Sequence, residues 1–281
     1  MNTVMTPDHA GLALAHRIAE CLPHRDGHAW TAAVYSAWWT TRPAARLTQS
    51  GRTGAVIVAV HPWRTEIAFQ LDDREPYGPD LVTDRTAPQP VTREILRRVL
   101  PLLDDATAAA QGPRPADAAP VRLEHLRRVG AVLRAHGVEP AEGRGMLAHS
   151  SALDWRGASG ARYWATLVGS NPAVDFMFRG PVRELEAVLP LFLDEPSGLP
   201  RRVRGVKSAV ERRLAAHLTR FATVEPFAVT GLSIDTVKGP HGFAVSICAP
   251  GAPVTDDSPA LAELHGVGAD FLISLVPLLT R

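Results

Sequence analysis

The chain has 281 residues, 30 basic and 29 acidic side chains, and a formal net charge of +1. This balance excludes the strong overall positive field of a protein dedicated to nucleic acid or anionic lipid. Only Cys21 and Cys248 are present, and no apolar run approaches the length of a membrane helix, so we expect a soluble cytoplasmic protein without disulfides or membrane contact.

Three segments of the chain contain nearly the same letters. They are "VLPLLDD" at Val99–Asp105, "VLPLFLDE" at Val188–Glu195 and "LVPLLTR" at Leu275–Arg281. Aligned on Pro101, Pro190 and Pro277, they are 89 and 87 residues apart. Apolar residues before each proline recur every three or four positions, which predicts an amphipathic helix. Because proline lacks a backbone donor, each helix is expected to kink or end close to it.

The first predicted unit covers residues 8–110. Helical spacing over Ala10–Leu22 opens it, and the letters "HAWTAAVYSAWWTT" and "AVIVAV" predict a β-hairpin through a turn at residues 51–54. A third strand is predicted around residues 67–71. The long segment 74–90 contains four prolines and few apolar residues, so we expect a surface loop before the closing helix.

The second and third predicted units cover residues 118–198 and 203–281. Helices over Val121–His136 and Val206–Phe221 open them. A hairpin follows in each, and unit two has a third strand over residues 174–178. In unit three, "APGAPVTDDSPAL" contains three prolines, which argues against a paired strand there. The predicted fold is therefore α+β, with three tandem α-β-β-β-α units whose antiparallel sheets are covered by helices, the third unit being degenerate.

One polar cluster raises the possibility of metal chemistry. Cys21, His24, Asp26 and His28 lie within eight residues, and all are zinc-ligand types. Their spacing matches no established metal motif, and the same letters suit a polar turn after a helix. GxSxG, GxGxxG and P-loop motifs are missing from the sequence. We therefore predict no catalytic residue, metal or cofactor, and a metal-dependent enzyme built on this cluster remains an alternative.

Four tryptophans are candidate binding residues. Trp38 and Trp39 are consecutive in a predicted strand, so their rings leave opposite faces of the sheet and at most one needs to enter the core of its own unit. Trp155 and Trp164 raise the same question in unit two. Indole rings are favoured interface anchors, although packing between units of this chain would also explain them.

A basic stretch in unit three gives the second set of candidates. This stretch contains only one acidic residue, Glu211, beside the basic residues Arg201, Arg202, Arg204, Arg212 and Arg213. A solvated helix face explains such a run, whereas nucleic-acid binding through the helix at residues 206–221 is the alternative.

The predicted α-β-β-β-α order resembles that of double-stranded-RNA-binding domains. The letters "KGPHGF" at Lys238–Phe243 also resemble the turn between their first two strands. The basic cluster that this family has at the start of its closing helix is missing, because residues 263–266 read "ELHG".

Repetition without a catalytic constellation favours a non-catalytic protein-binding function. Repeated units supply an extended surface, whereas an active site requires one asymmetric arrangement of groups. Adaptor, chaperone-like and immunity-type roles all fit. We expect another protein as the partner, with exposed aromatics and open sheet faces or edges as the contact elements.

Overall fold

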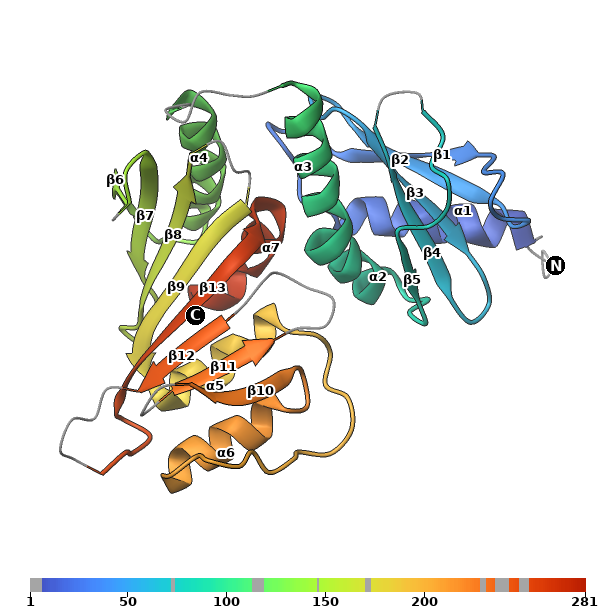
Figure 1. The fold of residues 1–281 in the computed structure, drawn as a ribbon. Helices are drawn as coiled ribbons and strands as arrows, with labels where there is room; N and C mark the ends of the chain where they lie inside the picture. The colour runs from blue at the N-terminus through green and yellow to red at the C-terminus, as the bar shows by residue number, and fades with distance from the viewer. Residues whose placement is uncertain are drawn as a thin grey trace. The chain divides into compact units, whose positions relative to one another are not determined.

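The computed structural model describes residues 7–71, 74–112, 119–145, 147–169, 173–227, 231–235, 243–247 and 253–281. The chain divides into two compact units, Met1–Arg114 and Pro115–Arg281. Each unit combines an antiparallel sheet with helices, so the predicted α+β class is confirmed (Figure 1). None of the helices in the described part of the chain is long and apolar enough to span a membrane.

The first unit contains a five-stranded sheet in the order β1-β2-β3-β4-β5. Its elements are α1 Pro7–Cys21, β1 Trp30–Tyr35, β2 Ala44–Gln49, β3 Ala55–Val60, β4 Thr65–Gln70, β5 Leu81–Thr83, α2 Pro88–Glu94, the π-helical turn Ile95–Val99 and α3 Leu100–Ala110.

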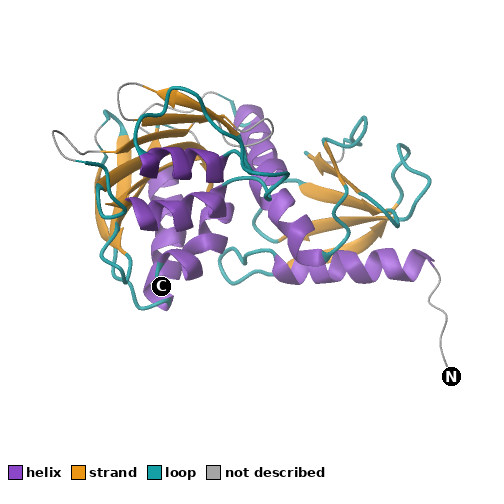
Figure 2. Cartoon of the chain, turned by 90° about the horizontal axis from the view of Figure 1, so that it is seen from below, coloured by secondary structure: helices purple, strands orange, loops and turns teal. Residues whose placement is uncertain are grey.

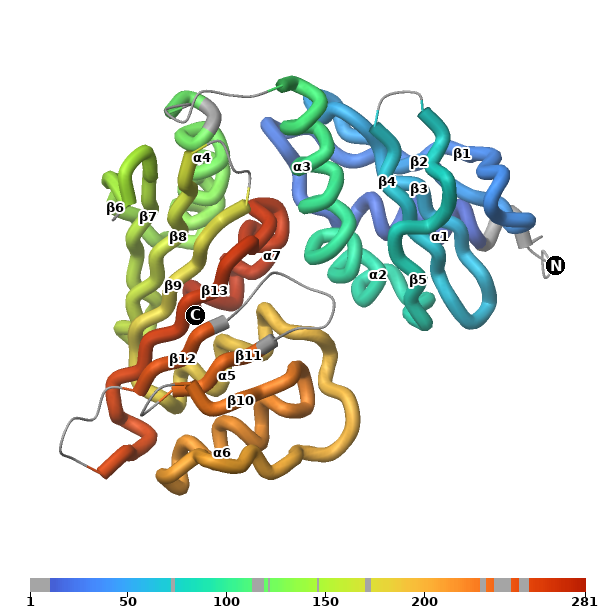
Figure 3. The backbone as a smooth tube through the Cα atoms, viewed as in Figure 1, coloured from blue at the N-terminus to red at the C-terminus, as the bar shows by residue number. Residues whose placement is uncertain are grey.

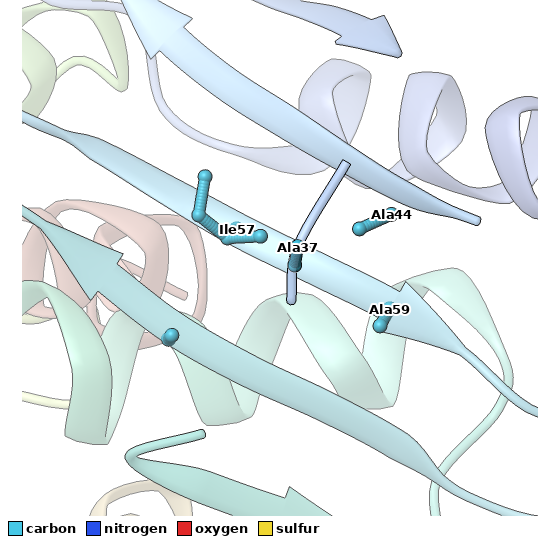
Figure 4. Packing of buried hydrophobic residues seen from close by; sticks show 5 residues of the cluster. Ala37, Ala44, Ile57 and Ala59 are labelled. Carbon is cyan, nitrogen blue, oxygen red and sulfur yellow. The ribbon is translucent and has the colours of Figure 1, made fainter. Parts of the chain in front are cut away.

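Both faces of this sheet are buried at its centre. Helix α1 contacts β1, β2 and β3, and its apolar stripe, which includes Leu14 and Ile18, is buried. Small side chains line the opposite face, where they form a cluster with the loop between β1 and β2 (Figure 4). Its buried members are Ala37, Ala44, Ile57, Ala59 and Ala68. Alanine leaves space for the loop to approach the strands closely, so a loop replaces a second helical layer.

The second unit contains an eight-stranded sheet in the order β10-β11-β12-β13-β9-β8-β7-β6. Its elements are α4 Ala119–Ala135, β6 Ala141–Arg144, β7 Ser150–Arg156, β8 Arg162–Val168, β9 Ala173–Pro181, α5 Val182–Phe192, α6 Ala209–Leu218, β10 Thr223–Phe227, β11 Gly231–Asp235, β12 Phe243–Ile247, β13 Pro259–Gly268 and α7 Ala269–Leu279.

Strands β9 and β13 form the centre of the eight-stranded sheet. They pair antiparallel and lie side by side in Figure 3. From this centre the order runs outward as β8, β7, β6 on one side and β12, β11, β10 on the other. Among the described residues, each half therefore has the same sequence of elements: one helix, four strands and one helix. The second unit contains both the second and the third predicted repeats.

The helices of the second unit lie on one side of its strands (Figure 2). Helix α4 contacts β7 and β8, α5 contacts β9 and β13, and α6 contacts β10. Aromatic rings fill the space between these layers. Phe192 of α5 lies 4.6 Å from Phe176 of β9 and 6.2 Å from Phe271 of α7, between ring centroids. One core thus joins the two halves of the sheet.

The three repeated prolines mark interruptions or ends of helices. Helices α5 and α7 each have 11 residues, and both end two residues after their internal prolines, Pro190 and Pro277. Pro101 lies in the first turn of α3, directly after the π-helical turn. Because proline cannot donate a backbone hydrogen bond, regular α-helical bonding is altered or lost near each site. The prediction that each helix kinks or ends there is confirmed for α5 and α7 by their ends.

The number of strands in each unit was predicted wrongly. In the described part of the chain, the halves of the large sheet have four strands each, and the first unit has five. In unit three, β13 is a ten-residue strand, so that copy is not degenerate in its strand content. Pro259 occupies the first position of β13, where a missing donor is tolerated. Segment 74–90 was also predicted wrongly as loop throughout, because it contains β5 and the start of α2.

Candidate functional site

The first pair of predicted tryptophans does not lie on a strand. Trp38 and Trp39 occupy the loop that follows β1, which ends at Tyr35. Trp38 is 63 % exposed and donates its indole N–H to the Pro76 carbonyl at 3.0 Å. Trp39 packs against the alanine cluster of its own sheet. The strand prediction was wrong because the apolar letters continue past the end of β1 into this loop.

The second pair lies on opposite faces of the eight-stranded sheet. Trp155 is only 2 % exposed and stacks on Tyr163 at 5.5 Å between ring centroids. It is a core residue beneath the helices and presents almost no exposed surface to a partner. Trp164 is paired across strands with Asp154, one residue before Trp155, so its ring points to the other face. Trp164 is half-buried and remains a binding candidate.

The burial of Tyr163 predicts a change of stability with pH. Burial raises the pKa of Tyr163 from 10.0 to about 12, and the charge of Glu184 acts in the same direction. The folded state therefore keeps the phenol proton at pH values where the unfolded chain loses it. This contribution is complete below pH 10 and is lost as the pH rises toward 12. Between pH 10 and pH 12, the free energy of unfolding, measured with urea, should therefore fall less in Tyr163→Phe than in the unsubstituted protein.

The exposed Tyr77 supplies the control for this pH experiment. Tyr77→Phe should retain the steep loss of stability of the unsubstituted protein. An identical pH dependence in all three proteins would show that Tyr163 does not retain its proton on folding.

No described helix lies on the second face of the eight-stranded sheet, which we call the uncovered face. At its centre Trp164 of β8 is directly paired with Met177 of β9, and Met177 with Glu263 of β13. Leu261 of β13 lies on the diagonal from Met177. Trp164, Met177 and Leu261 are all half-buried. They form a small apolar centre on adjacent, hydrogen-bonded strands.

Charged side chains surround this apolar centre. Arg162 donates through Nε to both carboxylate oxygens of Asp154, at 2.9 and 3.1 Å, and its guanidinium lies 4.8 Å from the centroid of the Trp164 ring. The hydrogen bonds that the Asp154 carboxylate accepts raise the pKa of Arg162. Arg162 is directly paired with Arg156 and with Arg179 on its neighbouring strands, and both of these are exposed without an ion-pair partner among the described residues. The border of the uncovered face is therefore positive at the end where Arg156, Arg162 and Arg179 are neighbours on β7, β8 and β9.

The predicted basic helix is shorter than its apolar pattern indicated. Helix α6 begins at Ala209 because Ser208 caps it. The Ser208 hydroxyl accepts from the Glu211 N–H, and the Glu211 carboxylate accepts from the Ser208 N–H. Arg213 donates to Glu186 at 3.0 Å and to Asp256 at 2.5 Å. Asp256 and Glu186 raise the pKa of Arg213. The positive charge of Arg213 is thus balanced by acids of the same protein.

The remaining arginines of this stretch line a groove beside an edge strand. Arg201, Arg202 and Arg204 are exposed, and none has an ion-pair partner among the described residues. Together with β10 and the end of α6 they enclose a space of about 490 Å³, which we call the arginine groove. Arg212 lies outside its lining and donates to the Lys207 carbonyl at 2.6 Å. The structure therefore brings together three of the five predicted arginines.

The polar cluster after α1 forms a tight turn. Arg25 and His28 pair as an isolated bridge, and Asp26 and Gly27 between them both have positive φ angles, 51° and 77°. Such a turn requires residues that tolerate the left-handed region, which explains the Asp-Gly pair. Within the part of the chain that the structure describes, no three His, Cys, Asp or Glu side chains are placed to hold a metal ion. The metal alternative therefore gains no geometric support.

The comparisons with known proteins add no assignment to this geometry. Models of protein families, curated proteins and solved structures were compared with the chain, and none matches it.

The resemblance to double-stranded-RNA-binding domains does not extend to the sheet. Residues 236–242, which contain most of its turn, lie outside the described part of the chain. Residues 263–266 belong to β13, and each half of the sheet has four strands.

Met177 and Leu261 were not predicted as site residues. In a strand, successive side chains point to opposite faces, so Met177 points away from the face that carries Phe176 and Phe178. This alternation could have identified Met177 as outward-facing. No strand was predicted where β13 lies, so the same alternation was not applied to Leu261.

Proposed function

We propose that this chain is a non-catalytic protein-binding protein whose partner docks on the uncovered face of the eight-stranded sheet. The observation that carries the proposal is the cross-strand pair of Trp164 and Met177 on a face without a described helix. Tryptophan, methionine and arginine are enriched at the centres of protein interfaces, and a polar border normally surrounds them. The uncovered face has this composition.

The rigidity of the face supports the same proposal. Trp164 is held by the guanidinium of Arg162, which is itself fixed by Asp154. Its ring therefore loses little conformational freedom when a partner covers it. Arg156 and Arg179 next to Arg162 favour acidic residues at the edge of the partner.

We also infer that the two halves of the sheet arose by duplication of one helix-sheet-helix module. Helices α5 and α7 have equal length, and proline is the ninth residue of each. When positions 87 apart are equated, the pair Met177–Glu263 corresponds to the adjacent pair Phe176–Leu264. An approximate twofold axis would pass between these two pairs. Such an arrangement doubles the width of the sheet and creates a broad face without adding further layers.

The proposed function predicts that a partner is captured through this face. The protein and a variant with Trp164→Ala, Met177→Ser and Leu261→Ser would each be used as bait in extracts of the source cell, with captured proteins identified by mass spectrometry. Because the three side chains form the apolar centre, the variant should retain less than about a tenth of the partner.

The capture experiment has a matched control in three exposed apolar residues away from this face. Val34→Ser, Leu147→Ser and Leu199→Ser, combined, change residues that are all more than half exposed. This control should capture the partner normally. Equal capture by bait and face variant, or no specific partner with any bait, would contradict the proposed function.

A further inference from the structure

We infer that the arginine groove binds an extended acidic peptide segment, which rests on the proposed function and names the chemistry of part of its partner. The groove is lined by Arg201, Arg202 and Arg204 and by residues of β10 that include Thr223, Glu225 and Pro226. Its lining carries three unpaired guanidinium groups and one carboxylate. The groove is therefore complementary to an anionic ligand.

The position of the groove favours a ligand whose backbone is extended. Strand β10 is an outer strand of the sheet, and its described pairing is with β11 only. Segment 201–206 packs against β10 where Gly205 approaches the Pro226 ring, but no backbone hydrogen bond joins it to the strand, so it does not pair with this edge. A peptide strand can use an open edge for backbone hydrogen bonds while its side chains supply specificity.

Pro226 defines which backbone groups are available. Proline has no N–H, so it fits this strand where its nitrogen points away from β11. In an antiparallel ladder, residues two apart point their backbone groups in the same direction. Val224 therefore has its N–H and C=O at the outer edge, together with the Pro226 carbonyl. These three groups allow a short pairing, which the arginines supplement through carboxylates of the ligand.

The composition of the groove favours an acidic peptide over nucleic acid. Single-stranded nucleic acid is usually held by aromatic side chains on which its bases stack, and the groove lining contains none. Duplex binding requires a broad row of phosphate contacts. On the neighbouring helix α6, Arg213 is already neutralised by Glu186 and Asp256.

The experiment uses two fluorescein-labelled peptides of identical length, one alternating Glu with Val and one alternating Gln with Val. Binding to the full chain is measured by fluorescence anisotropy at two salt concentrations. The glutamate peptide should bind at least about tenfold more tightly than the glutamine peptide, and the difference should shrink at high salt. A variant with R201Q, R202Q and R204Q should lose about tenfold in affinity for the glutamate peptide.

A charge-matched control separates the groove from the overall charge of the protein. The variant with R17Q, R42Q and R74Q removes three exposed arginines that also lack ion-pair partners among the described residues. It should bind the glutamate peptide within about twofold of the unsubstituted protein, because the three arginines that line the groove are unchanged. An equal loss in both triple variants would overturn the groove assignment.

Three further measurements complete the test. Hydrogen exchange of residues 223–227 should slow when the glutamate peptide is bound, and protection confined to other segments would overturn the assignment. Tighter binding of a single-stranded oligothymidylate than of the glutamate peptide would overturn the inference and identify nucleic acid as the ligand. The variant with Trp164→Ala, Met177→Ser and Leu261→Ser should still bind the peptide. If that variant loses partner capture while neither the unsubstituted protein nor any variant binds the glutamate peptide, this inference is overturned and the proposed function stands.

Discussion

Asp270→Ala is expected to destabilise the second unit by about 3–5 kcal/mol. Asp270 lies in the first turn of α7 and forms an ion pair with Arg128 of α4. The two side chains are only 5 % and 9 % exposed. Removing the carboxylate leaves a buried guanidinium without this partner, and the cost of that uncompensated charge exceeds the value of the pair itself. Urea unfolding, followed by hydrogen exchange of residues 119–135 and 269–279, measures the effect.

Two variants show whether burial of the charge is the cause. Arg128→Met combined with Asp270→Leu removes both charges and keeps similar volumes, so it should recover most of the lost stability. Glu124→Ala breaks the exposed pair of Glu124 with Arg127 on the same helix and should change stability by less than about 1 kcal/mol. An effect of Asp270→Ala as small as that of Glu124→Ala would contradict the buried pair.

Phe192→Ala is expected to cost about 3–5 kcal/mol and to weaken both halves of the large sheet together. The Phe192 ring is fully buried between Phe176 and Phe271. Its loss removes apolar contacts and leaves a cavity that the surrounding strands and helices cannot fill completely. Because this core joins both halves, hydrogen exchange should accelerate in β8 and in β12 by a similar factor.

Phe227→Ala is the matched control for that substitution. Phe227 lies in edge strand β10 and is 51 % exposed, so its truncation should change stability by less than about 0.5 kcal/mol. Faster exchange in β8 alone after Phe192→Ala would show that the halves are separate folding units.

Sequence periodicity predicted the buried elements more successfully than the exposed ones. Helices α1 and α4 and strands β8 and β9 were located because each has a buried stripe or alternating face. Strand β6 was missed because all four of its residues are exposed, which removes the alternating signal. Strand β13 was missed because prolines precede it and Pro259 begins it, although its later residues alternate between buried and more exposed positions.

The candidate site could be predicted only in part, because side-chain partners are set by the tertiary fold. Trp155 and Trp164 have the same residue type in neighbouring strands, and only the register assigns one to the core and the other to the uncovered face. Arg213 and Arg204 look equivalent in the basic stretch. Arg213 is paired with acids 27 and 43 residues away, which no local pattern indicates.

The most direct test of the uncovered face is photo-cross-linking from position 177. A benzophenone amino acid replaces Met177 in one sample and exposed Arg17 of α1 in another, and both are irradiated in the source-cell extract. The proposed function predicts a specific cross-linked partner from position 177, the same protein recovered by affinity capture, and none from position 17. The same products from both positions, or no product from position 177 while capture still succeeds, would contradict it.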